Sequence, residues 1–142
     1  MSIEDAKRIT REYYELVVGT GDVDRIDEFI DPAYTEIYLQ TGYPLGVDGA
    51  RRHVTGVREA FPDLTVRVDE QIAEGDRVAS LVTARGTHLG AWLGMAPTGR
   101  LLEFTAVNVD RVVGGLIVEH GGAANLLEPL LGCGAVSITS PA

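Results

Sequence analysis

The strongest constraint on the fold is a run of strand-forming segments in the second half of the chain. Apolar and polar residues alternate in four segments, at 64–72, 77–87, 100–112 and 116 to about 124. Gly75-Asp76 forms a short turn after the first segment, and Gly114-Gly115 forms one before the last. Because strands joined by tight turns pair antiparallel, this pattern predicts a sheet built largely from hairpins.

The first half of the chain has the period of helices instead. Ser2-Ile-Glu-Asp5 has the form of a capping box, and apolar residues recur at helical spacing from Ile3 to Val17. We expect a second short helix at 23–30, a strand at 34–40, a turn-rich loop at 42–46, a third helix at 49–61 and a closing helix at 125–131. This order predicts an α+β fold with helices packed on one face of an antiparallel sheet. If that sheet is strongly bent, the helices across its concave face would enclose a deep apolar pocket.

Length and composition fit one domain with a substantial core. The chain has 142 residues, of which 45% are apolar. We assign residues 1–136 to a single domain and expect residues 137–142 to form a flexible tail.

Charge and sequence signals limit the partners and the location. The formal net charge of −9 argues against nucleic acid as a main partner, because phosphate binding needs clustered Lys and Arg. Cys133 is the single cysteine, so no disulfide can form within the chain. No segment approaches the ~18 apolar residues of a membrane span, and the start lacks a signal-peptide pattern, so we expect a cytoplasmic location.

Five motifs in a fixed order carry a family resemblance. They are Phe61-Pro-Asp-Leu64, Ala73-Glu-Gly-Asp-Arg-Val-Ala79, Arg85-Gly-Thr-His-Leu-Gly90, Gly94-Met-Ala-Pro-Thr-Gly-Arg100 and Arg111-Val-Val-Gly-Gly-Leu-Ile-Val-Glu-His120. Together they resemble the SnoaL-like polyketide cyclases of the nuclear-transport-factor-two-like superfamily, over residues from about 61 to 131. The superfamily also includes ketosteroid isomerases, scytalone dehydratase and limonene epoxide hydrolase.

The resemblance implies a cone-shaped α+β barrel, in which a strongly curved mixed or antiparallel sheet and three N-terminal helices surround an apolar pocket. It also implies a hydrophobic polyketide substrate, acid/base ring closure or rearrangement, no metal, no organic cofactor, and a homodimer. One departure stands out: the family usually follows the Glu-His pair with Trp, then three residues, then a catalytic acid. Here those positions hold Gly121 and Asn125, and an amide cannot exchange protons near neutral pH.

Two carboxylates are therefore the main catalytic candidates. Glu36 lies on the expected early strand between aromatic residues, and other members of the superfamily place a catalytic carboxylate on this strand. Asp110 shares one strand face with Asn108, while Val107 and Val109 share the other. If Glu36 and Asp110 face each other in the pocket, their repulsion would separate their pKa values, as acid/base pairs require. The alternative is that both carboxylates point outward.

Tyrosine and histidine supply further catalytic candidates. Tyr14 could donate a hydrogen bond at the pocket mouth, although only one of the adjacent Tyr13 and Tyr14 should share the apolar helix face. His88, in the Gly-Thr-His motif, titrates near neutral pH and could carry protons. His53 is expected to be a packing residue, and the histidine spacing does not match a metal site.

The expected substrate-binding residues are Tyr38, Trp92, Asn108, His120 and Asn125. Trp92 and Leu93 belong to a loop at 90–99 that could form an apolar lid or a subunit contact. His120 should point away from the face shared by Glu119 and Gly121.

Three functions are compatible with these residues. The first is a cofactor-independent cyclase with Glu36 and Asp110 as proton carriers, and with Tyr14, His88 and Asn108 as orienting donors. The second is an epoxide-opening or cofactor-free hydroxylating enzyme that acts on a similar substrate. The third is a non-catalytic small-molecule binding protein, which the replaced acid at Asn125 favours.

Overall fold

The computed structural model describes residues 1–141 and has the expected α+β class. Its helical elements are α1 (Ile3–Glu12), the π-helix η1 (Tyr13–Val18), the 3₁₀ helix η2 (Val23–Glu28), α2 (Gly46–Ala60) and α3 (Leu127–Cys133). Its strands are β1 (Ile30–Tyr38), β2 (Thr41–Pro44), β3 (Thr65–Glu74), β4 (Arg77–Thr87), β5 (Leu101–Val113) and β6 (Leu116–Ala124). Both hydrogen bonds of the capping box form, since Asp5 N donates to Ser2 Oγ at 3.0 Å and Ser2 N donates to Asp5 Oδ2 at 3.2 Å.

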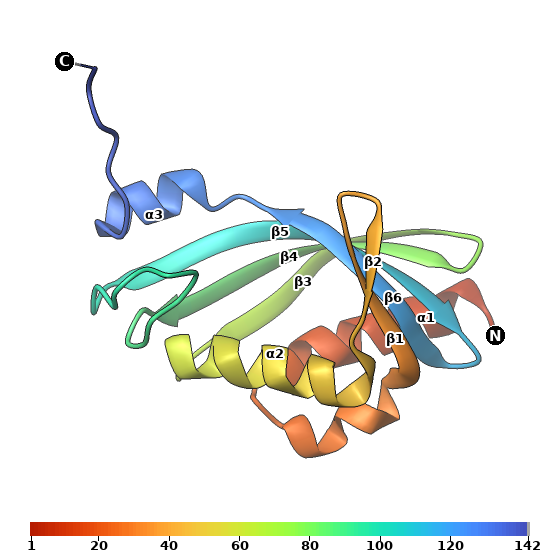
Figure 1. Cartoon of the computed structure of the whole chain (residues 1–142). Helices are drawn as coiled ribbons and strands as arrows, with labels where there is room; N and C mark the ends of the chain where they lie inside the picture. Colours follow the sequence, from red (N-terminus) through yellow and green to blue (C-terminus); the bar gives the residue numbers. More distant parts are fainter. Residues whose placement is uncertain (142) are drawn as a thin grey trace.

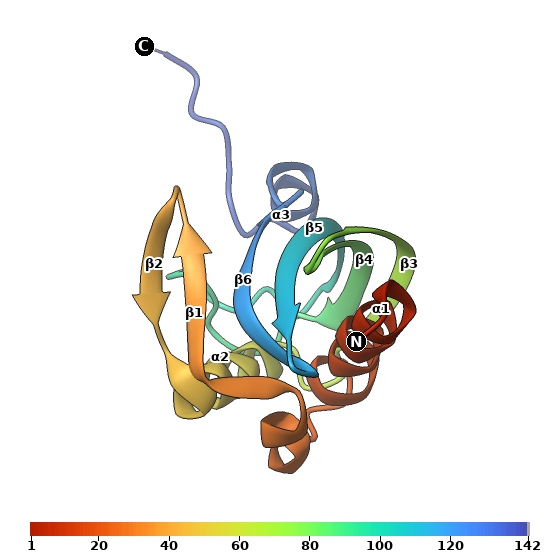
Figure 2. The same ribbon diagram turned by 90° about the vertical axis from the view of Figure 1, so that its right-hand side faces the viewer.

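The six strands form one mixed sheet in the order β2-β1-β6-β5-β4-β3. β1 and β6 pair parallel, whereas the other neighbours pair antiparallel. The order has two ends, β2 and β3, and no strand pair among residues 1–141 joins them, so hydrogen bonding leaves the sheet open. Figure 2 shows the sheet bending around the N-terminal helices.

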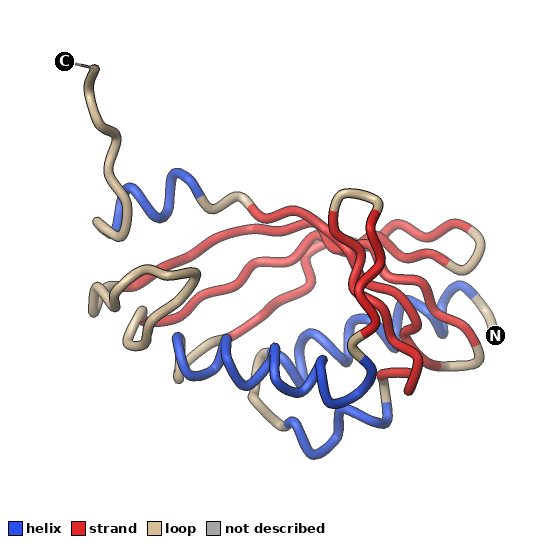
Figure 3. The backbone as a smooth tube through the Cα atoms, in the orientation of Figure 1, coloured by secondary structure: helices blue, strands red, loops and turns tan. Residues whose placement is uncertain are grey.

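The N-terminal helices form a second layer on one face of the sheet. Figures 1 and 3 show α1, η2 and α2 beneath the strands, with α3 at the far end and the C-terminus leading away. The core between the layers contains Ile26, Ile30 and Ile117, all fully buried. Phe61 and Leu102 anchor a second apolar cluster that reaches α3.

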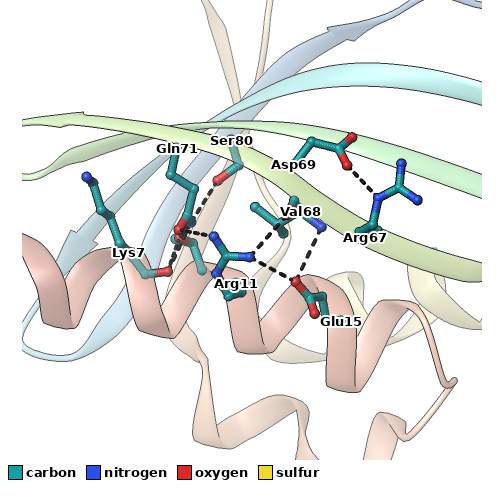
Figure 4. Close-up of polar contacts among 9 residues, drawn as sticks. Lys7, Arg11, Glu15, Arg67, Val68, Asp69, Gln71 and Ser80 are labelled. Atoms are coloured by element: carbon teal, nitrogen blue, oxygen red, sulfur yellow. Dashed lines mark hydrogen bonds and ion pairs between the residues drawn. The ribbon is translucent and has the colours of Figure 1, made fainter.

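Polar contacts fasten α1 to the sheet (Figure 4). The Gln71 side-chain amide on β3 donates to the Lys7 carbonyl at 3.0 Å, to Thr10 Oγ1 at 2.9 Å and to Ser80 Oγ at 3.2 Å. Arg11 donates to the Val68 carbonyl at 3.1 Å. Thr10 and Ser80 are fully buried, so these bonds satisfy groups that water cannot reach.

Some element boundaries differ from the expectation. β2 lies where a loop was predicted. The strand was missed because its four residues are all exposed and show no alternation. β1 begins at Ile30, where the second helix was expected to end, and it includes Pro32. Residues 137–141 of the expected tail contain no helix or strand, and Ala142 lies outside the described residues. No helix in residues 1–141 is long and apolar enough to cross a membrane.

Candidate active site

A cavity of about 310 Å³ lies between the sheet and the helices. Its wall is mostly aliphatic and aromatic, with residues from η1, α2, the 90–99 loop and strands of the sheet. The polar side chains in this wall are Tyr13, Tyr14, Tyr34, His53, Asn108 and His120. An apolar cavity with a few convergent polar groups is the usual form of a small-molecule site.

A fully buried carboxylate holds His120 from behind the cavity wall. Asp110 on β5 is 0% exposed and accepts a hydrogen bond from the Tyr14 hydroxyl. His120 Nδ1 lies 2.7 Å from Asp110 Oδ1 and 3.2 Å from the Tyr14 hydroxyl oxygen. The imidazole is therefore fixed in orientation, as a catalytic base is by a buried carboxylate.

A second carboxylate faces the other ring nitrogen. Glu36 Oε1 lies 3.6 Å from His120 Nε2, and the Tyr34 hydroxyl donates to Glu36 Oε2 at 2.8 Å. The Glu36 side chain is 35% exposed, so this end of the network is in contact with solvent. His120 lies between the two carboxylates that the sequence nominated as a facing pair.

Strand register brings these three residues together. In the sheet, Asp110 pairs with His120 across β5 and β6, and Glu36 pairs with His120 across β1 and β6. Directly opposed residues on neighbouring strands project to the same face, so all three side chains gather at one level of the sheet. We name Tyr14, Asp110, His120, Glu36 and Tyr34 the His120 network.

The surroundings of His120 favour its protonated form. Burial lowers the pKa of His120, but the charge and hydrogen bond of Asp110 and the charge of Glu36 outweigh burial, and the net pKa is raised. Burial, followed by the Asp110 charge, raises the pKa of Tyr14 well above its ordinary value. Tyr14 therefore stays a hydrogen-bond donor, while His120 holds its proton more tightly than a free imidazole does.

Both adjacent tyrosines are buried at the cavity, contrary to the expectation that only one would share the inner helix face. The helix changes from α to π geometry at Tyr13, and Gly19 N donates to the carbonyl of Tyr14, five residues earlier, at 2.9 Å. A wider π turn rotates the chain less per residue, so neighbouring side chains can share a face. The α-helical spacing used for the expectation also placed Ile3 and Leu16 inward, but both are exposed.

Of the remaining expected binding residues, Asn108 and Trp92 line the cavity. The Trp92 ring stacks on Phe104, with centroids 5.8 Å apart, and Leu93 lies beside it in the cavity wall. Tyr38 is 65% exposed on the β1–β2 hairpin and is not part of this wall.

Asn125 also lies outside the cavity wall. Its side-chain amide donates to Thr105 Oγ1 at 2.8 Å, beside a larger surface hollow of about 590 Å³ next to α3. None of the residues of the His120 network lines this hollow, so the network and this hollow are in different places.

His88 is fully buried, but it does not line the cavity. Thr98 N donates to His88 Nδ1 at 3.3 Å, and the His88 ring packs against Phe61 at 5.5 Å between centroids. Through these contacts with Thr98 and Phe61, His88 packs at the base of the 90–99 loop. His53, expected to be a packing residue, does line the cavity; partial burial lowers its pKa, although its side chain keeps contact with solvent.

Comparison with known proteins identifies the family. The family model described as SnoaL-like polyketide cyclase matches residues 7–131. The chain belongs to the SnoaL-like polyketide cyclase family. It is similar to the nogalonic acid methyl ester cyclase of Streptomyces nogalater, at 32% identity over 107 residues, which cover 72% of this chain and 78% of that protein.

Solved structures of similar sequence have the same fold. AclR, a candidate hydroxylase from Streptomyces galilaeus, is 27% identical with a TM-score of 0.82, over 98% of this chain and 87% of AclR. IdmH, a candidate polyketide cyclase from Streptomyces antibioticus, is 29% identical with a TM-score of 0.74, over 92% of this chain and 99% of IdmH.

The position of the usual family tryptophan is closely packed in this member. A Cβ atom added to Gly121 would lie 3.1 Å from the carbonyl oxygen of Ile37 on β1. At the next position, a Cβ on Gly122 would lie 2.4 Å from the Val107 carbonyl and 2.9 Å from Asn108 Oδ1. The two glycines allow β1 and β5 to approach β6, and Gly122 leaves room for the Asn108 carboxamide.

Proposed function

We propose that this protein closes or rearranges a ring on a hydrophobic polyketide intermediate, with His120 as the residue that exchanges a proton with the substrate. One observation carries the proposal. His120 lines an apolar cavity, while its Nδ1 lies 2.7 Å from the fully buried Asp110. The cavity would be the interior of the cone-shaped fold that the family resemblance implies.

The proposed chemistry is an intramolecular aldol-type closure. A methylene between two carbonyl groups loses a proton to neutral His120, which lines the cavity, whereas Glu36 does not. The resulting enolate carbon attacks a second carbonyl carbon, so one carbon–carbon bond forms. Protonated His120 gives its Nε2 proton to the new alkoxide oxygen, and the proton count closes. The closure has no net change in oxidation state, so the proposal includes no redox cofactor.

The two carboxylates have different roles in this proposal. Asp110 has no solvent contact and two hydrogen-bonding partners, so it orients His120 and stabilises the imidazolium. Glu36 is partly exposed and can exchange protons with water between turnovers. Acid/base transfer of this kind contributes about 10²–10⁴-fold, and holding a flexible chain in a reactive pose contributes more.

The test is turnover and binding of a panel of linear and cyclised polyketide intermediates, compared between the parent and His120→Gln, Glu36→Gln and Asp110→Asn. We expect His120→Gln to lower kcat by at least about 10²-fold while ligand binding persists. Tyr38→Phe is the control, because that residue is exposed and outside the cavity. Turnover that is unchanged in His120→Gln would refute the proposal, and binding without any turnover would favour a carrier protein.

A second candidate function is cofactor-free hydroxylation or epoxide opening. The observation that favours it is the similarity to AclR, a candidate hydroxylase that matches 98% of this chain. In epoxide opening, a carboxylate-activated water would attack the ring carbon. Oxygen from ¹⁸O-labelled water or ¹⁸O₂ in the product would identify this reaction, whereas an aldol closure incorporates neither.

We also propose that the protein forms a homodimer through the outer face of β5. This face exposes four apolar side chains, which are Leu101, Val107, Val109 and Val113. Light scattering at several concentrations should give twice the chain mass for the parent and the chain mass for Val107→Lys. A parent that stays monomeric throughout would exclude this assembly.

A further inference from the structure

Tyr13 is a cavity residue whose polar group has no role in the His120 network. Its side chain is 7% exposed, and its ring packs against Tyr14 at 5.6 Å and Phe29 at 6.1 Å between centroids. These contacts fix the ring from two sides. The residue also lines the cavity, so the fixed ring presents a surface to whatever the cavity holds.

The three buried tyrosines of the cavity differ in what their hydroxyls do. Tyr14 donates to Asp110, and Tyr34 donates to Glu36. No hydrogen bond within residues 1–141 involves the Tyr13 hydroxyl. The hydroxyl is not sealed in the core either, because His88 Nε2 is the single completely buried side-chain nitrogen or oxygen in that range without a partner. The Tyr13 hydroxyl therefore keeps some accessible surface, on a residue that lines the cavity.

The local backbone makes this arrangement possible. The π-helix η1 begins at Tyr13, and its wider turn allows both adjacent tyrosines to reach the cavity. Single π turns inside helices occur frequently at functional sites. Tyr14 then holds Asp110, which leaves Tyr13 available for another partner.

The Tyr13 hydroxyl stays protonated near neutral pH, so it can donate a hydrogen bond. Burial raises the pKa of Tyr13, and the charges of Asp110 and Glu36 raise it further. A phenol hydroxyl that makes no hydrogen bond in an apolar cavity costs free energy. A ligand with an oxygen acceptor should therefore bind more tightly than a ligand without one.

We propose that Tyr13 is a substrate-binding residue whose hydroxyl donates a hydrogen bond to a carbonyl or enolate oxygen of the substrate. This assignment rests on the proposed function, because it takes the occupant of the cavity to be an oxygen-rich polyketide. It separates the roles of two neighbouring tyrosines: Tyr14 positions Asp110 and through it His120, whereas Tyr13 touches the substrate.

A matched ligand pair tests the hydrogen bond without any turnover. The probes are 1-tetralone, labelled with ¹³C at the carbonyl, and tetrahydronaphthalene, which has the same ring system without the oxygen. Bound to the parent, the labelled carbonyl should absorb at lower infrared frequency than when bound to Tyr13→Phe. The Kd of 1-tetralone should rise about tenfold in Tyr13→Phe, as for the loss of one neutral hydrogen bond, and the Kd of tetrahydronaphthalene should stay unchanged.

Tyr14→Phe is the matched control, because it removes the neighbouring hydroxyl and also keeps the ring. It should retain the infrared shift of the bound ketone and change the pH profile of turnover, whereas Tyr13→Phe should leave the pH profile in place. Three results would overturn the inference: an infrared shift that persists in Tyr13→Phe, equal loss of both probes, or no saturable binding of 1-tetralone to the parent. The proposed function fails separately, when His120→Gln keeps full turnover.

Discussion

Tyr14→Phe removes one hydroxyl from the buried end of the His120 network and leaves the ring packing in place. Asp110 accepts hydrogen bonds from Tyr14 and from His120, and it has no exposed surface through which water could replace a lost donor. A hydrogen bond to a charged group contributes about 1.5–3 kcal/mol, and the absence of water places this one in the upper half of that range. We therefore expect the free energy of unfolding to fall by about 2–3 kcal/mol.

Thermal and urea unfolding measure this loss. For a chain of this length, about 1 kcal/mol corresponds to about 4 °C in Tm, so Tyr14→Phe should melt about 8–12 °C below the parent. Tyr13→Phe is the control, because no hydrogen bond within residues 1–141 involves its hydroxyl, so the loss of this hydroxyl should change the free energy of unfolding by less than about 0.5 kcal/mol. Equal losses in the two variants, or no loss in Tyr14→Phe, would refute the view that the Tyr14 hydroxyl supports the buried charge.

Burial, hydrogen bonding and backbone contacts lead to three further predictions. The folded protein raises the pKa of His120 above 6.5, so the stability contributed by protonated His120 is complete below pH 6.5 and is lost as the pH rises through the folded pKa. Urea titrations up to pH 9 should show this fall in the parent and a flatter profile in His120→Gln. Gln71→Leu should lower the free energy of unfolding by about 1–3 kcal/mol, since it unties α1 from β3 and β4, and kcat should stay at the parent value. Gly122→Ala should destabilise the fold by about 1–3 kcal/mol, because its Cβ would lie 2.4 Å from a backbone carbonyl. Gly132→Ala in α3 should stabilise it by about 0.4–1 kcal/mol, because its Cβ would meet no atom of residues 1–141 within 4 Å apart from its chain neighbours and its own helix backbone. A Gly122→Ala protein as stable as the parent would contradict the contact.

The strands of the second half of the chain could be predicted from local sequence patterns. β3, β4, β5 and β6 alternate, and short glycine turns join β3 to β4 and β5 to β6, so the amino-acid pattern alone was enough to place these two hairpins. β2 could not be placed in this way, because an exposed edge strand has no buried face to impose alternation. The π-helix was also missed, because apolar spacing predicts a helix but not the change in its turn at Tyr13.

Sequence patterns could suggest residues of the candidate site but not the contacts between them. Alternation along β5 correctly grouped Asn108 with Asp110 and placed Val107 and Val109 on the opposite face, which the structure shows to be exposed. Alternation along β6 also separated His120 from Glu119, but a period of two does not say which face looks into a cavity. The structure decides it, since Glu119 pairs with Arg77 at the surface while His120 lines the cavity.

The link from His120 to Glu36 depends on a feature that no local pattern predicts. β1 and β6 are the parallel pair of the sheet, and their register changes between Ile30 and Thr35. From the pair Ile30–Ile117 to the pair Thr35–Glu119, β1 advances five positions while β6 advances two. Within this interval Pro32 has no N–H for the ladder, and the Asp31 carboxylate accepts a hydrogen bond from Ala33 N at 2.7 Å, so the strand bends locally.

Without this interruption, regular pairing onward from Ile30 would put a different β1 residue opposite His120. Side chains alternate between faces, so a slip of one residue would turn the Glu36 carboxylate away from the imidazole and leave Nε2 without its acidic partner. The irregular start of β1 is therefore part of the site. It sets the register by which the carboxylates of this chain meet at His120, although the usual family acid is replaced by Asn125.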